Sequence, residues 1–208
     1  MPPLLSSPEM PKPESPPREP REAILSAAID ILHNHGAGAL TVRSVASAAG
    51  CSTTGVYTYF GGKNGLVEAI FIDGFQRFGA ALEVARAAGP PDGPVDVMAQ
   101  AYRDWALANP THYMVMFGRG VPDFHPSTEA LAIASGTFEQ LVDATTTMMA
   151  KLGISGAPLD IAHHLWAGMH GYVSLEIANM DRTNDPKERQ RRFDLGVRRL
   201  VHGCLPTD

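Results

Sequence analysis

Hydrophobic residues recur at helical spacing along almost the whole chain, and no segment alternates between hydrophobic and polar residues as a half-buried strand does. In the first periodic segment, Ile24, Ala28 and Ile31 share one face. We expect this helix to begin near Pro20 and to end at Gly36, a residue type that often follows the last helical turn. Continued along the chain, the pattern predicts about nine helices and no sheet, which is an all-α fold.

Two short helices are predicted next. Thr41 is suited to cap a helix that ends at Gly50, and Ser52 is suited to cap another that ends at about Phe60, before Gly61. The glycine at position 50 allows a tight turn, and the small side chains around it let the two helices pack closely. This arrangement is typical of a helix-turn-helix.

Longer helices are predicted for the rest of the chain. The Gly-Pro-Pro cluster at 89–91 is the best candidate for a junction between two domains. The segments expected after residue 62 are helices over 63–88, 94–109, 127–152, 158–180 and 186–201, with a short apolar piece over 111–117 and a loop over 118–126.

Composition narrows the class of protein. Hydrophobic residues make up 44% of the 208 positions, which is ordinary for a globular protein, and no apolar run is long enough to span a membrane. The start of the chain lacks the pattern of a signal peptide, and two cysteines are too few for a disulfide framework, so we expect a cytoplasmic protein. Residues 1–20 contain eight of the 17 prolines and are expected to form a disordered arm.

The net charge of -5 argues, at face value, against a nucleic-acid partner. The acidic residues are concentrated in the middle of the chain, however: residues 66–185 hold 14 acidic and six basic residues, whereas residues 1–65 hold five of each. No acidic residue lies between His33 and Asn64. The predicted helix-turn-helix therefore lies in a segment whose charge is compatible with phosphate.

The second helix of this motif has an exposed face of short or hydrogen-bonding side chains that can lie against base edges in a major groove. Residues 41–63 read TVRSVASAAGCSTTGVYTYFGGK and resemble the DNA-binding domain of the TetR family of transcriptional regulators. The resemblance is carried by Thr41, Ala49-Gly50-Cys51-Ser52, Tyr57, Phe60 and Lys63. Cys51 stands where the family usually has an aliphatic residue, and Thr54-Gly55 replaces the commoner Gly-Thr pair.

The resemblance implies phosphate contacts from Thr41, Tyr57 and Lys63. Arg43 is as well explained as a solvated charge, and the hydroxyls of Thr41 and Ser52 could serve only as helix caps. The full set of expected DNA-binding residues is Thr41, Arg43, Ser52, Thr53, Thr54, Gly55, Tyr57, Thr58, Tyr59 and Lys63.

The segments 101–117 and 166–176 resemble a TetR subgroup whose C-terminal domain carries a Trp-x-x-x-His-Gly signature, here Trp166, His170 and Gly171. The resemblance implies a DNA-binding domain at 21–66, a connecting helix at 67–89, and a ligand-binding and dimerisation domain at 94–208. The alternative for each candidate pocket residue is that it only fills the core. The candidates are Tyr102, Trp105, Met114, Phe117, Phe138, Thr145, Trp166 and His170.

Dimerisation is expected through the last two helices, about 159–180 and 186–202, as an intersubunit four-helix bundle, which is the usual arrangement in the family. The small residues expected to permit close approach are Gly168, Gly171, Ala178 and Gly196. The basic run in the last helix is expected to be a solvated face that pairs with acidic residues across the dimer, and consists of Arg189, Arg191, Arg192, Arg198 and Arg199.

The leading hypothesis is a homodimeric repressor of a palindromic double-stranded DNA operator, released by an apolar or amphipathic small molecule, with the fourth helix as transmitter. His163, His164 and His170 lack the spacing of a metal site, and no cofactor is expected. One alternative is redox sensing through Cys51, although this side chain also suits a small apolar plug. Another is an all-helical enzyme, but no motif of nucleophile, phosphate loop or metal ligands supports it.

Overall fold

The computed structural model describes residues 19–90, 94–118 and 120–205, so most of the predicted proline-rich arm lies outside the described residues. Within them the chain forms nine α-helices, one short 3-10 helix and no strand, which confirms the all-α prediction. The elements are α1 (Pro20–His35), η1 (Ala37–Ala39), α2 (Val42–Ala48), α3 (Thr53–Phe60), α4 (Lys63–Ala88), α5 (Pro94–Ala108), α6 (Pro110–Phe117), α7 (Thr128–Leu152), α8 (Pro158–Ile177) and α9 (Pro186–His202).

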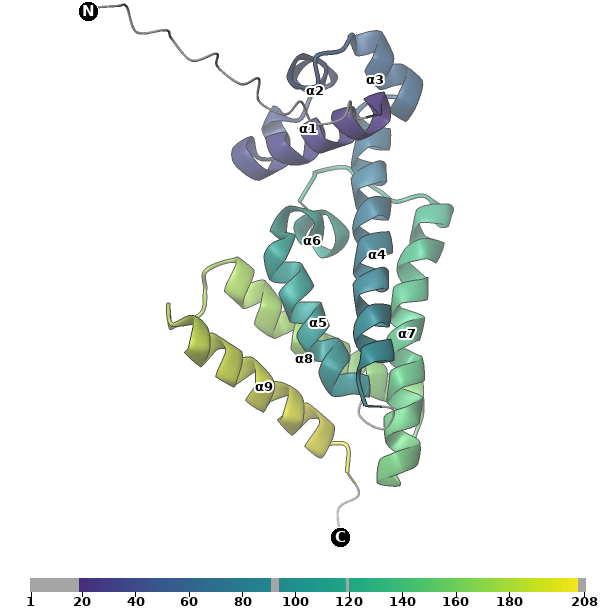
Figure 1. Cartoon of the computed structure of the whole chain (residues 1–208), viewed down its shortest axis with the longest axis vertical. Helices are drawn as coiled ribbons and strands as arrows, with labels where there is room; N and C mark the ends of the chain where they lie inside the picture. The colour runs from purple at the N-terminus through teal and green to yellow at the C-terminus, as the bar shows by residue number, and fades with distance from the viewer. Residues whose placement is uncertain (1–18, 91–93, 119, 206–208) are drawn as a thin grey trace, which may run out of the picture.

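Helices α1, α2 and α3 lie together at one end of the molecule, and α4 runs from them along the length of the body (Figure 1). Helices α5, α6 and α7 pack directly on α4, while α8 packs on α5 and α7. Helix α9 lies on the outside of the body against α8 and α5. One long helix therefore belongs both to the small N-terminal bundle and to the larger body.

The helix ends follow the predicted caps. The Thr41 hydroxyl accepts a hydrogen bond from the Ser44 backbone N–H, and the Ser44 hydroxyl accepts one from the Thr41 N–H, which makes a reciprocal capping box. The Ser52 hydroxyl caps α3 by accepting a hydrogen bond from the Gly55 backbone N–H, without a reciprocal side-chain bond. Gly61 then ends α3 with a φ of 69°, a left-handed conformation that favours glycine.

Two predicted boundaries differ from the structure. Helix α8 ends at Ile177 rather than near Met180, because Asn179 adopts a positive φ of 53° and turns the chain away. The short apolar piece expected after Pro110 is a complete helix, α6, with the proline in its first turn, where its missing N–H has no helical partner to lose.

The core of the N-terminal bundle joins its three helices to the start of α4. Val45 of α2 and Val56 of α3 are fully buried, and they belong to the same apolar cluster as Ile24 of α1 and Leu66 of α4. Burying a valine side chain contributes about 1.5–3 kcal/mol to the free energy of unfolding. The orientation of α3 is therefore fixed against α4 by apolar packing.

A buried polar network joins α5, α8 and α9. Arg103 and Glu176 form an ion pair with N···O distances of 2.8 and 3.0 Å, and their side chains are only 7% and 10% exposed. Arg103 also donates to the Gln190 side chain, whose amide donates to Gln100 and Asp194 at 2.7 Å. Three helices thus share one hydrogen-bonded cluster, which the sequence pattern did not indicate.

Two of the small residues expected between subunits instead serve packing within the chain. A Cβ added at Gly168 of α8 would lie 2.2 Å from a Leu200 methyl carbon, and one at Gly196 of α9 would lie 2.4 Å from the Tyr172 ring. Both glycines therefore permit the close approach of α8 and α9 to each other. Gly171 and Ala178 are exposed on α8 and have no such role within the chain.

Two of the five arginines of α9 have acidic partners in their own chain, and Arg189 instead donates to the Thr183 carbonyl. Arg191 and Arg192 pair with Glu188 on the same helix, and Arg192 also pairs with Asp181 at 2.9 Å. Hydrogen bonds from the two arginines lower the pKa of Glu188 to about 2. Arg198 and Arg199 are exposed, in keeping with the predicted solvated face.

Among the described helices, none is long and apolar enough to cross a membrane.

Candidate DNA interface and ligand cavity

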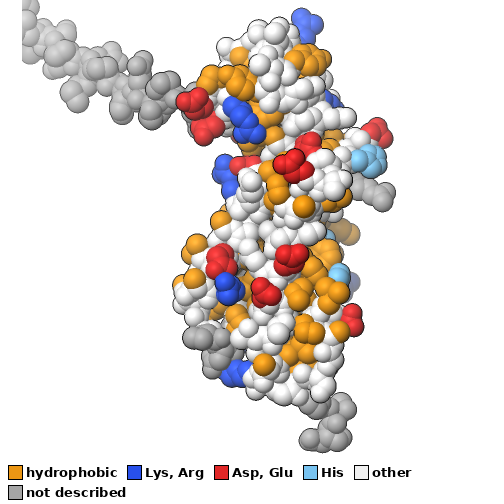
Figure 2. Space-filling view, turned by 90° about the vertical axis from the view of Figure 1, so that its right-hand side faces the viewer, with side chains coloured by type: hydrophobic (Ala, Val, Ile, Leu, Met, Phe, Trp, Pro, Cys, Tyr) orange, Lys and Arg blue, Asp and Glu red, His pale blue; other side chains and the backbone are white. Residues whose placement is uncertain are grey.

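Helix α3 presents a row of polar side chains to solvent, while Val56 and Phe60 face the core. The Tyr57 and Tyr59 side chains are 58% and 46% exposed. The exposed set on and just before this helix is Ser52, Thr53, Thr54, Tyr57, Thr58 and Tyr59, with Gly55 half-buried. In Figure 2 the upper tip of the molecule, formed by α2 and α3, is mostly white and orange with a few blue side chains, whereas red side chains lie farther down the molecule. The expected DNA-binding residues of α3 therefore share one accessible surface.

Several hydroxyls on this surface already have partners within the chain. Thr41 and Ser52 are engaged as helix caps, which confirms that both residues have this structural role. The Thr58 hydroxyl donates to the Thr54 carbonyl at 2.9 Å. A hydroxyl oxygen that donates or accepts one hydrogen bond keeps further capacity, so these residues can still contact DNA.

The two basic residues of the motif differ in their surroundings. Arg43 is exposed on α2. Lys63 is half-buried at the first position of α4, and its Nζ donates to the Ala37 carbonyl at 3.4 Å. The N-cap of α4 is Gly62, which offers no side-chain cap, so the first backbone N–H groups of this long helix have no side-chain acceptor there. Uncapped helix N-termini with a nearby lysine suit phosphate.

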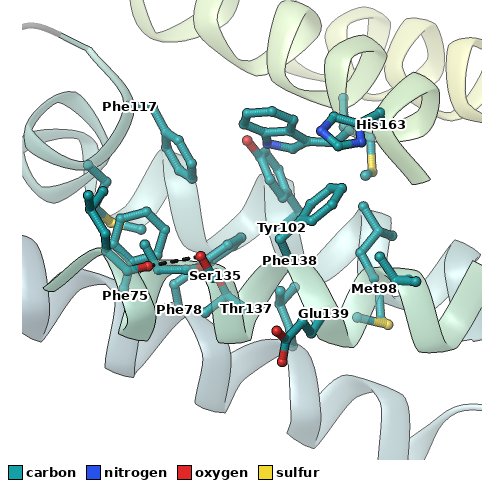
Figure 3. A pocket seen from close by; sticks show the side chains of 18 of the residues that line it. Phe75, Phe78, Met98, Tyr102, Phe117, Ser135, Thr137, Phe138, Glu139 and His163 are labelled. Atoms are coloured by element: carbon teal, nitrogen blue, oxygen red, sulfur yellow. Dashed lines mark hydrogen bonds between the residues drawn. The ribbon is translucent and has the colours of Figure 1, made fainter. Parts of the chain in front are cut away.

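A cavity of about 820 Å³ lies in the body between α4, α5, α6, α7 and α8. Its walls are mainly aromatic rings and aliphatic or methionine side chains, and Figure 3 shows Phe75, Phe78, Tyr102, Phe117 and Phe138 around a common space. It opens to solvent along α7 and α8, where Leu131, Leu159 and His163 are exposed lining residues. A cavity of this size and character suits a small, largely apolar molecule.

Four of the eight predicted pocket residues line this cavity: Tyr102, Phe117, Phe138 and Trp166. The other four do not line it. Met114 is 51% exposed on the outer side of α6, and Thr145 is completely buried in the core. Trp105 packs against the Phe78 ring with centroids 5.1 Å apart, and the Nδ1 atom of His170 is turned toward two tyrosines.

The sequence pattern missed the contribution of α4 to the cavity. Phe71, Phe75, Phe78 and Leu82 recur every three or four residues on this helix and line the cavity together. The spacing is visible in the sequence, but the expectation for this helix is a connection between domains and signal transmission, and not a wall of the cavity. The helix that begins beside α3 therefore also forms a wall of the cavity.

Behind the cavity wall, three buried or half-buried polar side chains form a cluster. The Tyr102 and Tyr113 hydroxyls lie 2.8 Å apart, and Nδ1 of His170 lies 2.7 Å from the Tyr113 hydroxyl and 3.2 Å from that of Tyr102. Burial raises the pKa of Tyr113 to about 12 and raises that of Tyr102 further, while it lowers the pKa of His170. All three groups are therefore held in their neutral forms near neutral pH.

Helix α6 touches both the cavity and the N-terminal bundle. Met116 and Phe117 line the cavity, whereas the Thr111 hydroxyl lies 3.0 Å from Nδ1 of His33 in α1. A Cβ on Gly74 of α4 would lie 2.7 Å from the Met116 sulfur, so α6 lies unusually close to α4 at this point. No pattern in the sequence indicates this contact between α1 and α6.

His112 of α6 fastens the same helix to α4. Its Nε2 lies 3.1 Å from a carboxylate oxygen of Asp73, which Arg77 also contacts at 2.8 Å. Burial alone would raise the pKa of Asp73, but the hydrogen bonds from His112 and Arg77 outweigh it and lower the pKa. A charged carboxylate is therefore stabilised at the junction of α4 and α6.

The remaining candidate chemistry is not assembled into a site within the described residues. There, no three His, Cys, Asp or Glu side chains come together as a metal site. His163 and His164 are exposed on α8, and Cys51 packs against the core of the N-terminal bundle as a half-buried thiol.

Comparison with known families gives two matches that together span most of the described chain. Residues 24–70 match the family described as bacterial regulatory proteins, tetR family. Residues 95–200 match the family described as tetracyclin repressor-like, C-terminal domain. The first match contains α2 and α3, and the second contains the helices that form most of the cavity.

Individual relatives agree over nearly their full lengths. The HTH-type transcriptional regulator Rv1816 of Mycobacterium tuberculosis is 24% identical over 221 aligned positions, which cover 88% of this chain and 93% of the relative. A crystal structure of the regulatory protein SCO4313 has a TM-score of 0.75 at 27% identity and covers 88% of this chain and 95% of that one. A protein of unknown function from Rhodococcus sp. RHA1 has the same fold, with a TM-score of 0.79 at 24% identity over 93% of this chain and 100% of its own.

Proposed function

This chain belongs to the TetR family of bacterial transcriptional regulators, and on that premise we propose that it is a homodimeric repressor whose hold on its operator is released by a small molecule. The family membership confirms the resemblance that residues 41–63 carry. It also makes the chain a DNA-binding regulator rather than an enzyme. A regulator of this kind works where the chromosome is, in the bacterial cytoplasm.

Helix α3 is the proposed recognition helix. Thr53, Thr54, Thr58 and Tyr59 are exposed on it and face the major groove, and the half-buried backbone of Gly55 lets the groove wall approach. The exposed Tyr57, the capping Thr41 and Ser52, and Arg43 contact the sugar-phosphate backbone around it. Lys63 exchanges its weak hydrogen bond to Ala37 for a phosphate at the start of α4.

Two copies are needed to read a palindromic operator, with half-sites about 34–36 Å apart. The outer face of α8 supports such a dimer, because small or apolar side chains are exposed there at helical spacing. These residues are Ala167, Gly171 and Leu175, with Ala178 just after the end of the helix and the exposed Leu159 and Tyr172 beside them. Helices α8 and α9 of each copy then form the four-helix bundle.

The cavity is the proposed ligand site, and α4 and α6 connect it to DNA. Helix α4 holds Phe75 and Phe78 in the cavity wall and packs at its start against α3, while α6 joins the cavity to α1 through Thr111 and His33. A ligand that fits only one arrangement of these helices shifts the population toward it. The released state is the one in which the two recognition helices no longer match the half-sites.

The observation that carries the proposal is that one continuous helix, α4, both supports α3 and lines the cavity. The test is a gel shift of the purified full chain with the DNA upstream of its own gene, beside the same DNA with both inverted half-sites scrambled. We expect a retarded complex that contains two chains and appears only with the intact sequence. Equal binding to the two DNAs would contradict specific operator recognition.

A further inference from the structure

We propose that the cavity selects a cationic amphiphile, a molecule with an apolar chain or ring system and a protonated amine at one end. This inference rests on the proposed function, since it names the chemical class of the ligand for the same cavity. It follows from counting which hydrogen-bond donors, acceptors and charges the cavity wall offers to a guest.

The hydroxyl and imidazole donors near the mouth of the cavity are already used within the chain. The Ser135 hydroxyl donates to the Leu131 carbonyl at 3.0 Å, and the Thr137 hydroxyl donates to the Ala134 carbonyl at 2.7 Å. Nδ1 of His163 lies 3.1 Å from the Leu159 carbonyl, and because a carbonyl only accepts, Nδ1 carries the proton. The two hydroxyls therefore present oxygen lone pairs to a guest, and the neutral form of His163 with its proton on Nδ1 presents the lone pair of Nε2.

Donor groups on the inner wall of the cavity are also used within the chain. The indole N–H of Trp166 acts on the Tyr102 hydroxyl as a donor, and it partly opposes the rise in the Tyr102 pKa that burial causes. The Tyr102 proton is in turn used in the cluster with Tyr113 and His170. A ligand rich in acceptors, such as a carboxylate, would find no free donor among these groups, whereas a ligand that brings its own N–H donors would find several acceptors.

The charged residues that line the cavity also favour a cationic ligand. Glu139 and Asp143, one turn apart on α7, are exposed lining residues, and none of the described residues that line the cavity is Lys or Arg. Asp143 lies within electrostatic reach of Arg86 on α4, so Glu139 is the stronger candidate for an uncompensated charge. Figure 3 shows the Glu139 side chain at one edge of the lining residues. Exposed carboxylates are ionised near neutral pH and favour a cation over an anion.

Aromatic rings lie beside these acceptors. The Phe138 ring is 4.5 Å from that of His163 and 5.8 Å from that of Trp166, measured between centroids. The negative faces of aromatic rings attract a cation, and most strongly where water is excluded. Deeper in, Phe71, Met98 and Met169 leave only apolar surface for the rest of the ligand. The cavity thus has an acceptor-rich, acidic mouth and an apolar interior.

The test compares three probes that share one alkyl chain and differ in the head group: decylammonium, decanol and decanoate. Each is titrated into the full-length dimer at about pH 8, where the amine is protonated and the acid is ionised, and below the concentration at which it forms micelles. Binding is followed by calorimetry and by the fluorescence of the two tryptophans, of which Trp166 lines the cavity. We expect decylammonium to bind at least about tenfold more tightly than decanoate, with decanol between them.

The variant Glu139→Gln locates the source of the preference, because it keeps the shape of the side chain and removes its charge. We expect it to weaken decylammonium binding about fivefold while leaving decanol binding unchanged. Glu129→Gln is the matched control, since Glu129 is exposed on the same helix but does not line the cavity. Asp143→Asn provides a second variant if Glu139→Gln unfolds at a lower temperature than the unmodified chain.

The outcomes separate this inference from the function it rests on. Tighter binding of decanoate than of decylammonium would overturn the cationic class and leave the cavity as a ligand site. An equal loss for decylammonium and decanol in Glu139→Gln would overturn the role of its charge. Failure of all three probes to bind would overturn both the inference and the proposed ligand response.

Discussion

The hydroxyl of Tyr113 in α6 lies 2.7 Å from Nδ1 of His170 in α8. Burial lowers the pKa of His170, so Nδ1 of the neutral ring can accept a hydrogen bond from the Tyr113 hydroxyl. The Tyr113 oxygen can in turn accept a hydrogen bond from the Tyr102 hydroxyl. The hydrogen bonds therefore run in one direction from α5 through α6 to α8. Protonating His170 would reverse its role from acceptor to donor and disrupt the sequence of bonds.

Thermal stability should therefore depend on pH through His170. A histidine in the unfolded chain has a pKa of about 6.5, and the pKa of His170 in the folded chain is lower. Between these two values the unfolded chain binds a proton that the folded chain does not, so the free energy of unfolding falls as the pH falls through this window and levels off below the folded pKa. We expect the Tm to drop as the pH falls below about 6.5, toward the lowered pKa of folded His170.

The variant His170→Gln should lose part of this pH dependence. His164→Gln, at an exposed position on the same helix, should retain it. Melting curves followed by circular dichroism at several pH values provide the comparison. If both variants show the pH dependence of the unmodified chain, the stability effect does not come from His170.

Gly171→Arg should separate the dimer into monomers. Nothing lies within 4 Å of a Cβ added at Gly171, so the chain itself tolerates the change, but an arginine there would protrude from the proposed interface. We expect a monomer in sedimentation experiments and a loss of operator affinity of about a hundredfold or more, because the two half-sites are then bound independently.

Gly136→Arg is the control for this change, since Gly136 lies on α7 and also has open space around its added Cβ. It should remain a dimer. A dimeric Gly171→Arg variant would place the interface elsewhere on the molecule.

Lys63→Ala should weaken binding to all DNA sequences alike. If Lys63 contacts a phosphate, its removal lowers the slope of log affinity against log salt concentration by about one unit. Changes at Thr53 or Thr58 should instead alter the preferred operator sequence, because both residues are exposed on the proposed recognition helix, where they would face the bases. Lys187→Ala is the control, because Lys187 is exposed on α9 and lies outside the N-terminal bundle. It should leave the slope of log affinity against log salt concentration unchanged. An unchanged slope in Lys63→Ala would remove this residue from the interface.

Arg103→Met should destabilise the chain by about 3–5 kcal/mol, because it leaves the buried carboxylate of Glu176 without its partner. Adding Glu176→Leu to the same chain should recover much of the loss, since an apolar pair can replace a buried ion pair. Urea unfolding of the two variants and of the unmodified chain measures the difference. A double variant that is less stable than Arg103→Met alone would contradict this account.

Local features of this fold could be predicted from the sequence, and features that depend on distant packing could not. Thr41 and Ser52 cap α2 and α3 as expected, because a cap needs only the next three residues. Gly168 and Gly196 were expected between subunits, but Leu200 and Tyr172 of the same chain fill the space beside them. Small residues indicate that something approaches closely, without indicating which element does.

The candidate sites divide in the same way. The surface of α3 follows from the pattern of one short helix: Thr53, Thr58 and Tyr59 are exposed as expected, whereas Gly55 is half-buried. The cavity is built from five helices, so residues with similar sequence patterns have different fates: Phe117 lines it, whereas Met114 of the same helix faces solvent. Which side of α6 turns inward is decided by its contacts with α4, which are distant in sequence.

The walls of the cavity are divided between two sets of helices, and this division bears on how the protein can change over evolutionary time. Glu139 and His163, on α7 and α8, lie at the mouth, whereas the contacts with the N-terminal bundle belong to α4 and α6. Mutations at the mouth can therefore exchange one inducing compound for another while the linkage to DNA stays intact. A protein with this fold can therefore evolve to bind a new ligand without changes in the helices that connect the cavity to the N-terminal bundle.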